Sequence, residues 1–145
     1  MLRKMTLGSL GLILGLGLLT GCGQSYEGDY QGNLSMSGSV QAAGKTVPLN
    51  QTMPGMSVKV SKSGDGFQIV TPQCTLEATE DKASKSLMIK EDQSCPVKAA
   101  GKTMQVATSG SAKIADGKID LTIEGAISGE ATGTVKWGFK GNKKE

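Results

Sequence analysis

Beyond residue 22 the chain alternates apolar and polar residues with a period of two, which is the pattern of half-buried β-strands. The clearest runs are 118–124 and 134–140, in which every second residue is apolar. Shorter runs of the same kind cover 56–60, 74–78 and 86–90. Since no stretch after residue 22 repeats its apolar residues at the spacing of a helix face, we predict an all-β domain.

Turn signals separate these runs. Residues 63–66 read Ser-Gly-Asp-Gly and residues 115–118 read Ala-Asp-Gly-Lys, and both supply residues that tolerate the positive φ of tight hairpins. Further turns are expected at 80–85 and 92–94. The spacing predicts an antiparallel up-and-down meander of about eight strands. Closure into a small barrel would remove the exposed edges, and a two-sheet β-sandwich is the alternative.

One segment occurs twice, at 40–47 and 97–104, with Ala-Ala-Gly-Lys-Thr in common. Gly-Lys-Thr suggests a phosphate-binding loop, but the glycine required five residues earlier is replaced by Ser39 in one copy and Pro96 in the other. We predict instead two hairpin tips, each with a type I turn over the two alanines and the glycine in a left-handed bulge.

The N-terminal segment has the parts of a secretory signal. Arg3 and Lys4 precede an apolar run over 5–19, and small residues follow. This run of 15 residues is shorter than the ~20 residues of a membrane-spanning helix, although an uncleaved membrane helix is the alternative.

The residues Leu-Thr-Gly-Cys at 19–22 resemble the lipobox of bacterial lipoproteins. The resemblance implies cleavage of a signal peptide over 1–21 and acylation of Cys22, for example with palmitate. It also implies a location in the bacterial cell envelope, where the acyl chains insert into membrane lipid. Gly23, rather than an aspartate, follows this cysteine and favours the outer membrane if the source is Gram-negative. We expect a short tether over 22–25, a domain over 26–142 and a polar tail over 143–145.

The composition of the mature chain limits its partners. Removal of 1–21 from 145 residues leaves 124, with 14 lysines against 13 acidic residues. This near-neutral balance argues against nucleic acid as a partner. Val, Ile, Leu and Phe make up 21 of the 124 residues, which predicts a thin core that a cross-link would help to stabilise.

Two cysteines remain after Cys22, and in an exported protein they most simply form a disulfide between Cys74 and Cys95. Two free thiols are the alternative. If 74–79 and 86–91 pair as a hairpin and Cys95 starts the next strand, the cysteines lie two strand spacings apart, about 9.5 Å. That exceeds the ~7 Å limit between bridged Cα atoms. The bond therefore requires the turn at 91–94 to curl over a strand end, or a different register.

Two further segments have the pattern of a known family. Residues 26–34 carry an aromatic-x-Gly-x-Tyr-x-Gly spacing, and 133–141 contain alternating Val135, Trp137 and Phe139 between glycines. With the lipobox, they make the chain similar to small bacterial lipoproteins with a calycin-like (lipocalin-like) β-barrel. The resemblance implies a barrel, although Gly28-Asp29-Tyr30 stands where lipocalins have Gly-x-Trp.

No catalytic or metal site is apparent in the sequence. The chain has no histidine, which removes the commonest general base and metal ligand, and it has no Gly-x-Ser-x-Gly motif. Acidic pairs such as Glu80-Asp81 fall in expected turns, where solvated charge is the simpler interpretation. We therefore expect a protein that is not an enzyme and has no cofactor.

Two functions fit these observations. The first is a binding module for a small apolar ligand, held in the barrel lumen. The residues expected to point inward are Met56, Val58, Phe67, Ile69, Leu121, Ile123, Trp137 and Phe139, and the alternative is that they only form the core. The second is a protein-interaction lipoprotein, such as an inhibitor of a secreted hydrolase or an accessory subunit of an envelope machine. Its partner would contact the loops expected at 48–55 and 80–94.

Overall fold

Nine β-strands make up the domain in a computed structural model that describes residues 25–99 and 101–145. The signal segment, Cys22 and most of the tether lie outside the described residues. The strands are β1 (Gly28–Ala42), β2 (Lys45–Ser63), β3 (Gly66–Val70), β4 (Thr75–Asp81), β5 (Ser86–Ile89), β6 (Gln93–Ala99), β7 (Lys102–Ala115), β8 (Lys118–Ile127) and β9 (Ala131–Lys143). The expected all-β class is confirmed, with nine strands where about eight were predicted.

All nine strands belong to one antiparallel sheet in the order β5-β4-β3-β2-β1-β9-β8-β7-β6. β5 also pairs with β7, so a ring of hydrogen bonds runs through eight strands and leaves out β6. The first and last strands are neighbours over most of their length, from Tyr30 opposite Lys143 to Ala42 opposite Ala131. This direct contact between chain ends closes the meander.

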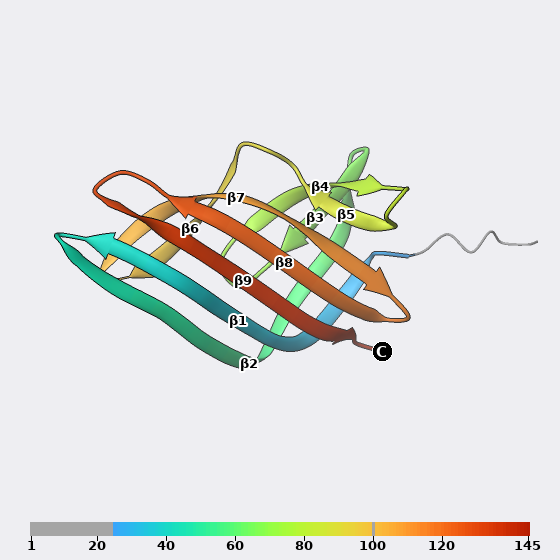
Figure 1. Ribbon diagram of the computed structural model, residues 1–145. Helices are drawn as coiled ribbons and strands as arrows, with labels where there is room; N and C mark the ends of the chain where they lie inside the picture. Colours follow the sequence, from blue (N-terminus) through green and yellow to red (C-terminus); the bar gives the residue numbers. More distant parts are fainter. Residues whose placement is uncertain (1–24, 100) are drawn as a thin grey trace, which may run out of the picture.

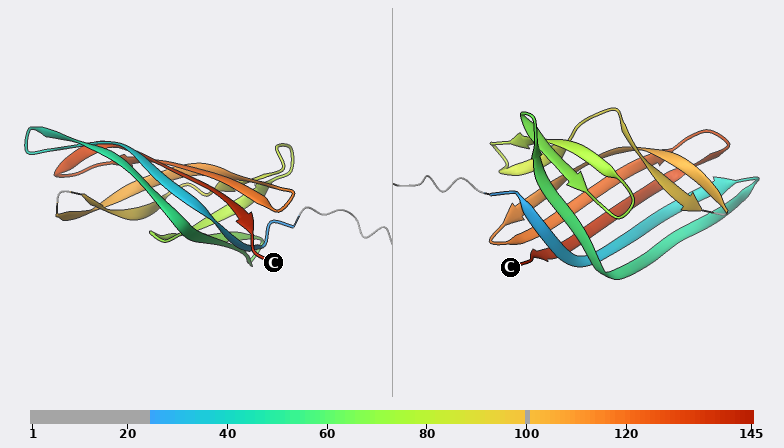
Figure 2. Two further views of the ribbon diagram at one scale, coloured as in Figure 1. Left: turned by 90° about the horizontal axis from the view of Figure 1, so that it is seen from below. Right: turned by 180° about the vertical axis from the view of Figure 1, so that it is seen from behind.

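The ring is complete around only one end of the molecule. β3, β4 and β5 have five, seven and four residues, whereas β1 and β2 have 15 and 19. β3 therefore covers only Lys59–Ser63 of β2. We call this end, with the tips 64–65, 82–85 and 116–117, the closed end. Beyond it β2, β1, β9, β8, β7 and β6 form a curved sheet with two free edges, the open half, seen in Figures 1 and 2.

The hairpin tips fall where the turn residues predict them, but one tip differs in type. Ala42 pairs with Lys45, and both residues between them, Ala43 and Gly44, have positive φ (51° and 73°). This is a two-residue turn of the I′ kind, whose twist matches that of the strands. The expected type I turn with a glycine bulge is therefore wrong at this tip, because an alanine adopts the left-handed conformation.

Alternation along the strands produces a single core. On β8, Ile119, Leu121 and Ile123 are buried, and on β9 the same holds for Trp137 and Phe139, while the residues between them are exposed or half-buried. The other strands contribute Tyr30, Leu34, Val58, Ile69, Leu76, Leu87 and Val106, each at most 2% exposed. Burial of apolar side chains on one face of every strand is what holds the ring together.

Candidate functional site

Side chains fill the interior of the closed end. Of the eight residues expected to line a lumen, seven are buried and Met56 is half-buried. Between Leu34, Leu121, Trp137 and their neighbours remains a cavity of about 10 Å³, the size of roughly one water molecule. An eight-stranded ring is just wide enough for side chains to fill. This cavity therefore has no room for a ligand.

Aromatic residues plug the same end. The ring of Tyr26 meets that of Phe67 edge to face, with 5.3 Å between centroids. The Tyr26 hydroxyl donates to Glu80 Oε1 at 3.4 Å, and the Tyr30 hydroxyl donates to the Tyr26 carbonyl at 2.9 Å. Burial, together with the negative charge of Glu80, raises the pKa of Tyr26, and burial raises the pKa of Tyr30. These contacts tie residue 26 firmly to the strands.

The disulfide joins Cys74 to Cys95 with 5.4 Å between their Cα atoms, so the predicted pairing is confirmed. β5 ends at Ile89, and the turn that follows crosses the end of this short strand. β6 then lies next to the start of β4 instead of one strand further away. The expected obstacle of two strand spacings is removed because the shared neighbour does not extend to the cysteines.

A side chain that the sequence does not mark holds this crossing in place. The amide of Gln93 accepts from the backbone N–H of Glu77 at 2.6 Å and donates to the Glu77 carbonyl at 2.8 Å. It also donates to the Lys90 carbonyl at 2.8 Å. A side-chain amide has the donor and acceptor of a peptide group. The side chain of Gln93 therefore pairs with Glu77 of β4 as the backbone of a neighbouring strand would. Only the tertiary structure reveals this role.

The open half contains the groove that we consider the candidate site. Its volume is about 340 Å³, and it lies between the free edges of β2 and β6. Apolar and small polar side chains line it: Met36, Gln51, Met53, Pro72, Gln73, Pro96, Val97, Lys98, Thr103 and Trp137. Of the predicted lumen residues, only Trp137 lines this groove, because the others face the filled interior.

The segments expected to be loops are largely strands. Residues 48–55 belong to β2, and β5 occupies the middle of 80–94. Pairs alternate between hydrogen-bonded and non-hydrogen-bonded along an antiparallel ladder. Counting from the Ala42–Lys45 pair, Pro48 opposite Ser39 falls at a non-hydrogen-bonded position. Its missing N–H therefore faces the free edge, where proline is tolerated and hinders strand addition.

Pro96 has the same position in β6. It lies opposite Gln105, three pairs from the Ala99–Lys102 pair that flanks the tip, so its ring nitrogen also faces the free edge. Prolines thus protect both edges of the groove from backbone pairing with another chain. Contacts made in the groove are accordingly expected to involve side chains more than backbone.

Trp137 connects the interior with the groove. Its side chain is 3% exposed and lines both the 10 Å³ cavity and the groove. The indole Nε1 is the one buried side-chain nitrogen or oxygen without a hydrogen-bond partner among residues 25–99 and 101–145. Buried polar groups are nearly always paired. An acceptor placed beside this Nε1–H would therefore form the hydrogen bond that it lacks.

Charged groups lie mainly on the outer surface. The pairs Lys90–Glu77, Lys102–Glu130 and Lys136–Glu124, at 3.4–3.6 Å, are exposed and contribute little to stability. Hollows of about 460 and 630 Å³ on the outer face of β1 and β7–β9 are open and lined mostly by small or charged side chains. In the described part of the chain, no group of three or more His, Cys, Asp or Glu residues is placed to hold a metal ion.

Among the described ranges, no helix is long and apolar enough to cross a membrane.

Comparison with known proteins adds little. The sequence matches no protein-family model and no curated protein. A crystal structure of a structural-genomics protein of unknown function from Bacteroides ovatus is similar with a TM-score of 0.31 and 11% sequence identity. The match covers 81% of this chain and 46% of that chain, so the present chain spans about half its length. A similarity at this level supports no conclusion about function.

Proposed function

We propose that this protein is a lipid-anchored protein of the bacterial envelope that has no enzymatic activity and binds a small apolar ligand in the groove of its open half. Because side chains fill the interior, we place the ligand in this groove instead. One observation carries the proposal: the buried Nε1–H of Trp137 has no partner and belongs to a side chain that lines the groove.

The lining residues indicate the chemistry of the ligand. Met36 and Met53 are half-buried and flexible, so they adapt to apolar chains of different shape. An unpaired buried N–H destabilises the protein by about 1–3 kcal/mol, which an acceptor oxygen on the ligand would recover. Lys98 at the rim adds a positive charge. An apolar chain that ends in a carboxylate meets all three conditions.

Trp137 is the only tryptophan of the chain, so its emission reports directly on the groove. We would titrate residues 23–145, which include all nine strands, with dodecanoate and separately with dodecylamine. Dodecanoate should change the emission of Trp137 in a saturable way. Dodecylamine should not, because it is cationic at neutral pH and offers no acceptor. Equal responses to both probes, or no response to either, would contradict the proposed ligand chemistry.

Two methionines allow a matched control. Met53→Glu places a charge in the groove and should abolish the response. Met88→Glu makes the same change on the outer face of β5, where Met88 is 42% exposed, and should leave the response intact. If Met53→Glu binds dodecanoate as the parent does, the ligand lies elsewhere.

A protein partner is the second candidate, and the exposed side chains along the free edge of β2 favour it, since Pro48 opposes backbone pairing at that edge. From Lys45 to Ser57 this strand pairs with β1 alone, so a long surface beside the groove has no neighbour in the described domain. A photo-crosslinking residue at Gln51 should then yield one discrete adduct in the intact envelope, which a crosslinker at Gln68 should not reproduce. Adducts of many sizes from Gln51 would count against a specific partner.

A further inference from the structure

The start of the described chain lies in the middle of a rim of hairpin tips. Tyr26 contacts Phe67, next to the 64–65 tip, and Glu80, next to the 82–85 tip. At the other side the Lys144 N–H donates to the Asp29 carbonyl and the Lys143 N–H to the Gly117 carbonyl, both at 2.7 Å. The chain therefore leaves the domain between the tips of the closed end, as Figure 2 shows.

The chain that would link this point to the lipid is short. From Cys22 to Ser25 there are three Cα–Cα steps, which reach at most about 11 Å when fully extended. Tyr26 does not lengthen the tether, because its side chain is 3% exposed and packed against Phe67. If Cys22 carries the lipid, the closed end has little freedom to leave the membrane surface.

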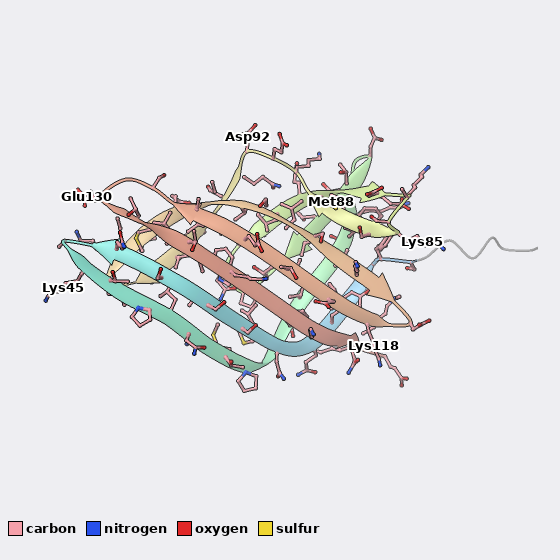
Figure 3. All side chains as sticks on the ribbon, viewed as in Figure 1. Lys45, Lys85, Met88, Asp92, Lys118 and Glu130 are labelled. Carbon is pink, nitrogen blue, oxygen red and sulfur yellow. A yellow bond between two sulfur atoms is a disulfide. The ribbon has the colours of Figure 1, made fainter. Side chains whose placement is uncertain are left out.

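We propose that the closed end of the ring is the membrane-facing surface of this protein and that the open half projects away from the bilayer. This inference rests on the lipid anchor of the proposed function. The partner is a lipid surface, and the tips on several sides of the attachment point limit the tilt of the domain. Lys85 and Lys118 lie at this end, whereas Lys45 and Glu130 lie at the opposite end (Figure 3).

The length of the strands sets the distance between the two ends. β1 runs without interruption from the closed end to the 43–44 tip over 15 residues, which corresponds to about 50 Å. The tips at 43–44 and 128–130 gather at the far end (Figure 1). The groove lies between, on the half that faces the periplasm or the cell exterior, where a ligand or partner reaches it from water.

Electrostatic attraction does not produce this orientation. The lysines of the closed end are matched by acidic residues at the same end, among them Asp29, Asp65, Glu80, Asp81 and Asp116. With no excess positive charge, the surface has no general affinity for anionic headgroups. The short tether alone should keep the closed end at the membrane surface. A longer tether should therefore let the domain change its orientation while it stays anchored.

The test compares two labelled positions on the full-length lipidated protein in phosphatidylcholine vesicles that contain Ni²⁺-chelating headgroups. A nitroxide is attached at Lys118→Cys or at Glu130→Cys, both exposed and both outside the groove. Relaxation by Ni²⁺ should be several-fold stronger at position 118 than at 130. Equal relaxation at both positions, or stronger relaxation at 130, would overturn the proposal.

A variant with a longer tether tests whether the short tether causes this orientation. Insertion of a Gly-Ser segment of about 12 residues after Gly23 raises the root-mean-square reach to about 20 Å and should reduce the difference between the two labels. An unchanged difference would show that the short tether does not set the orientation and would also overturn the proposal. Mass spectrometry of each preparation reports acylation of Cys22 independently, so a failed anchor is distinguished from a failed orientation.

Discussion

The disulfide should make a large contribution to the stability of this domain. We consider the variant Cys74→Ala/Cys95→Ala, which removes the bond and leaves a small apolar side chain at each site. The sequence separation is 21 residues. In the chain-entropy model, closure of a loop of that length stabilises the folded state by about 3 kcal/mol. Cys95 is 1% exposed, so alanine there is favoured over serine, whose hydroxyl would need a partner.

Urea unfolding followed by Trp137 emission measures this loss. With an m value of about 1.5 kcal/mol/M, a loss of 3 kcal/mol lowers the unfolding midpoint by about 2 M. The two single variants should lose as much as the double variant, because each removes the same bond and their effects are therefore not additive. Reduction of the parent protein with a thiol should give the same midpoint as the double variant.

A loss below about 1 kcal/mol would refute the reasoning. It would mean that the denatured chain is already restricted near these cysteines, so that the bond removes little entropy from it. Single variants with clearly different losses would refute it in another way, because packing of the individual sulfurs would then exceed the effect of the bond.

Three further predictions concern the closure of the ring, the Gln93 bridge and the aromatic plug. Gly32→Ala should destabilise the protein by more than 2 kcal/mol, since its Cβ would collide with the Lys140 carbonyl on β9. Gly138→Ala is the matched control in the same strand pair and should be tolerated, because its Cβ meets only a serine hydroxyl, at 3.0 Å. Gln93→Ala removes three hydrogen bonds to backbone and should lower the free energy of unfolding by roughly 1–3 kcal/mol; Gln93→Glu, which lacks the N–H donors, should not restore it. The pKa of Tyr26 is raised in the folded state from its ordinary value of 10.0, so its contribution to stability is fully present below about pH 10 and declines as the pH rises through the folded pKa. Unfolding midpoints measured between pH 9 and 12 should therefore fall, and Tyr26→Phe should remove part of this pH dependence.

Local patterns were sufficient to predict most of the strands. Alternation at 118–124 and 134–140 became β8 and β9, because burial of one face of a strand depends on residues two positions apart. The tip at 115–118 was predicted for a similar reason: Asp116 and Gly117 have φ of 54° and 72°, and these residue types tolerate such values. The disulfide followed from the number of cysteines and the implied export.

Predictions failed where distant contacts outweighed local preferences. The loop expected at 48–55 is a strand instead, because the nitrogen of Pro48 faces a free edge and Pro54 lies at the register shift, where it has no partner on β1. Nothing in the local sequence says which edge is free. The type of the 42–45 turn was also missed, because Ala43 accepts a positive φ that the pairing of β1 with β2 imposes.

The sequence by itself determined an all-β chain with a charged and apolar leader, about eight strands and most of their turns, because these depend on neighbours along the chain. Only the tertiary structure decided that the ring closes around one end. That depends on the short length of β3, β4 and β5 relative to β1 and β2, and on which strands meet after the chain crosses the end of β5. The groove beside Trp137 follows from the same mismatch in length. The edges of β2 and β6 stay apart because β3, β4 and β5 are too short to join them there.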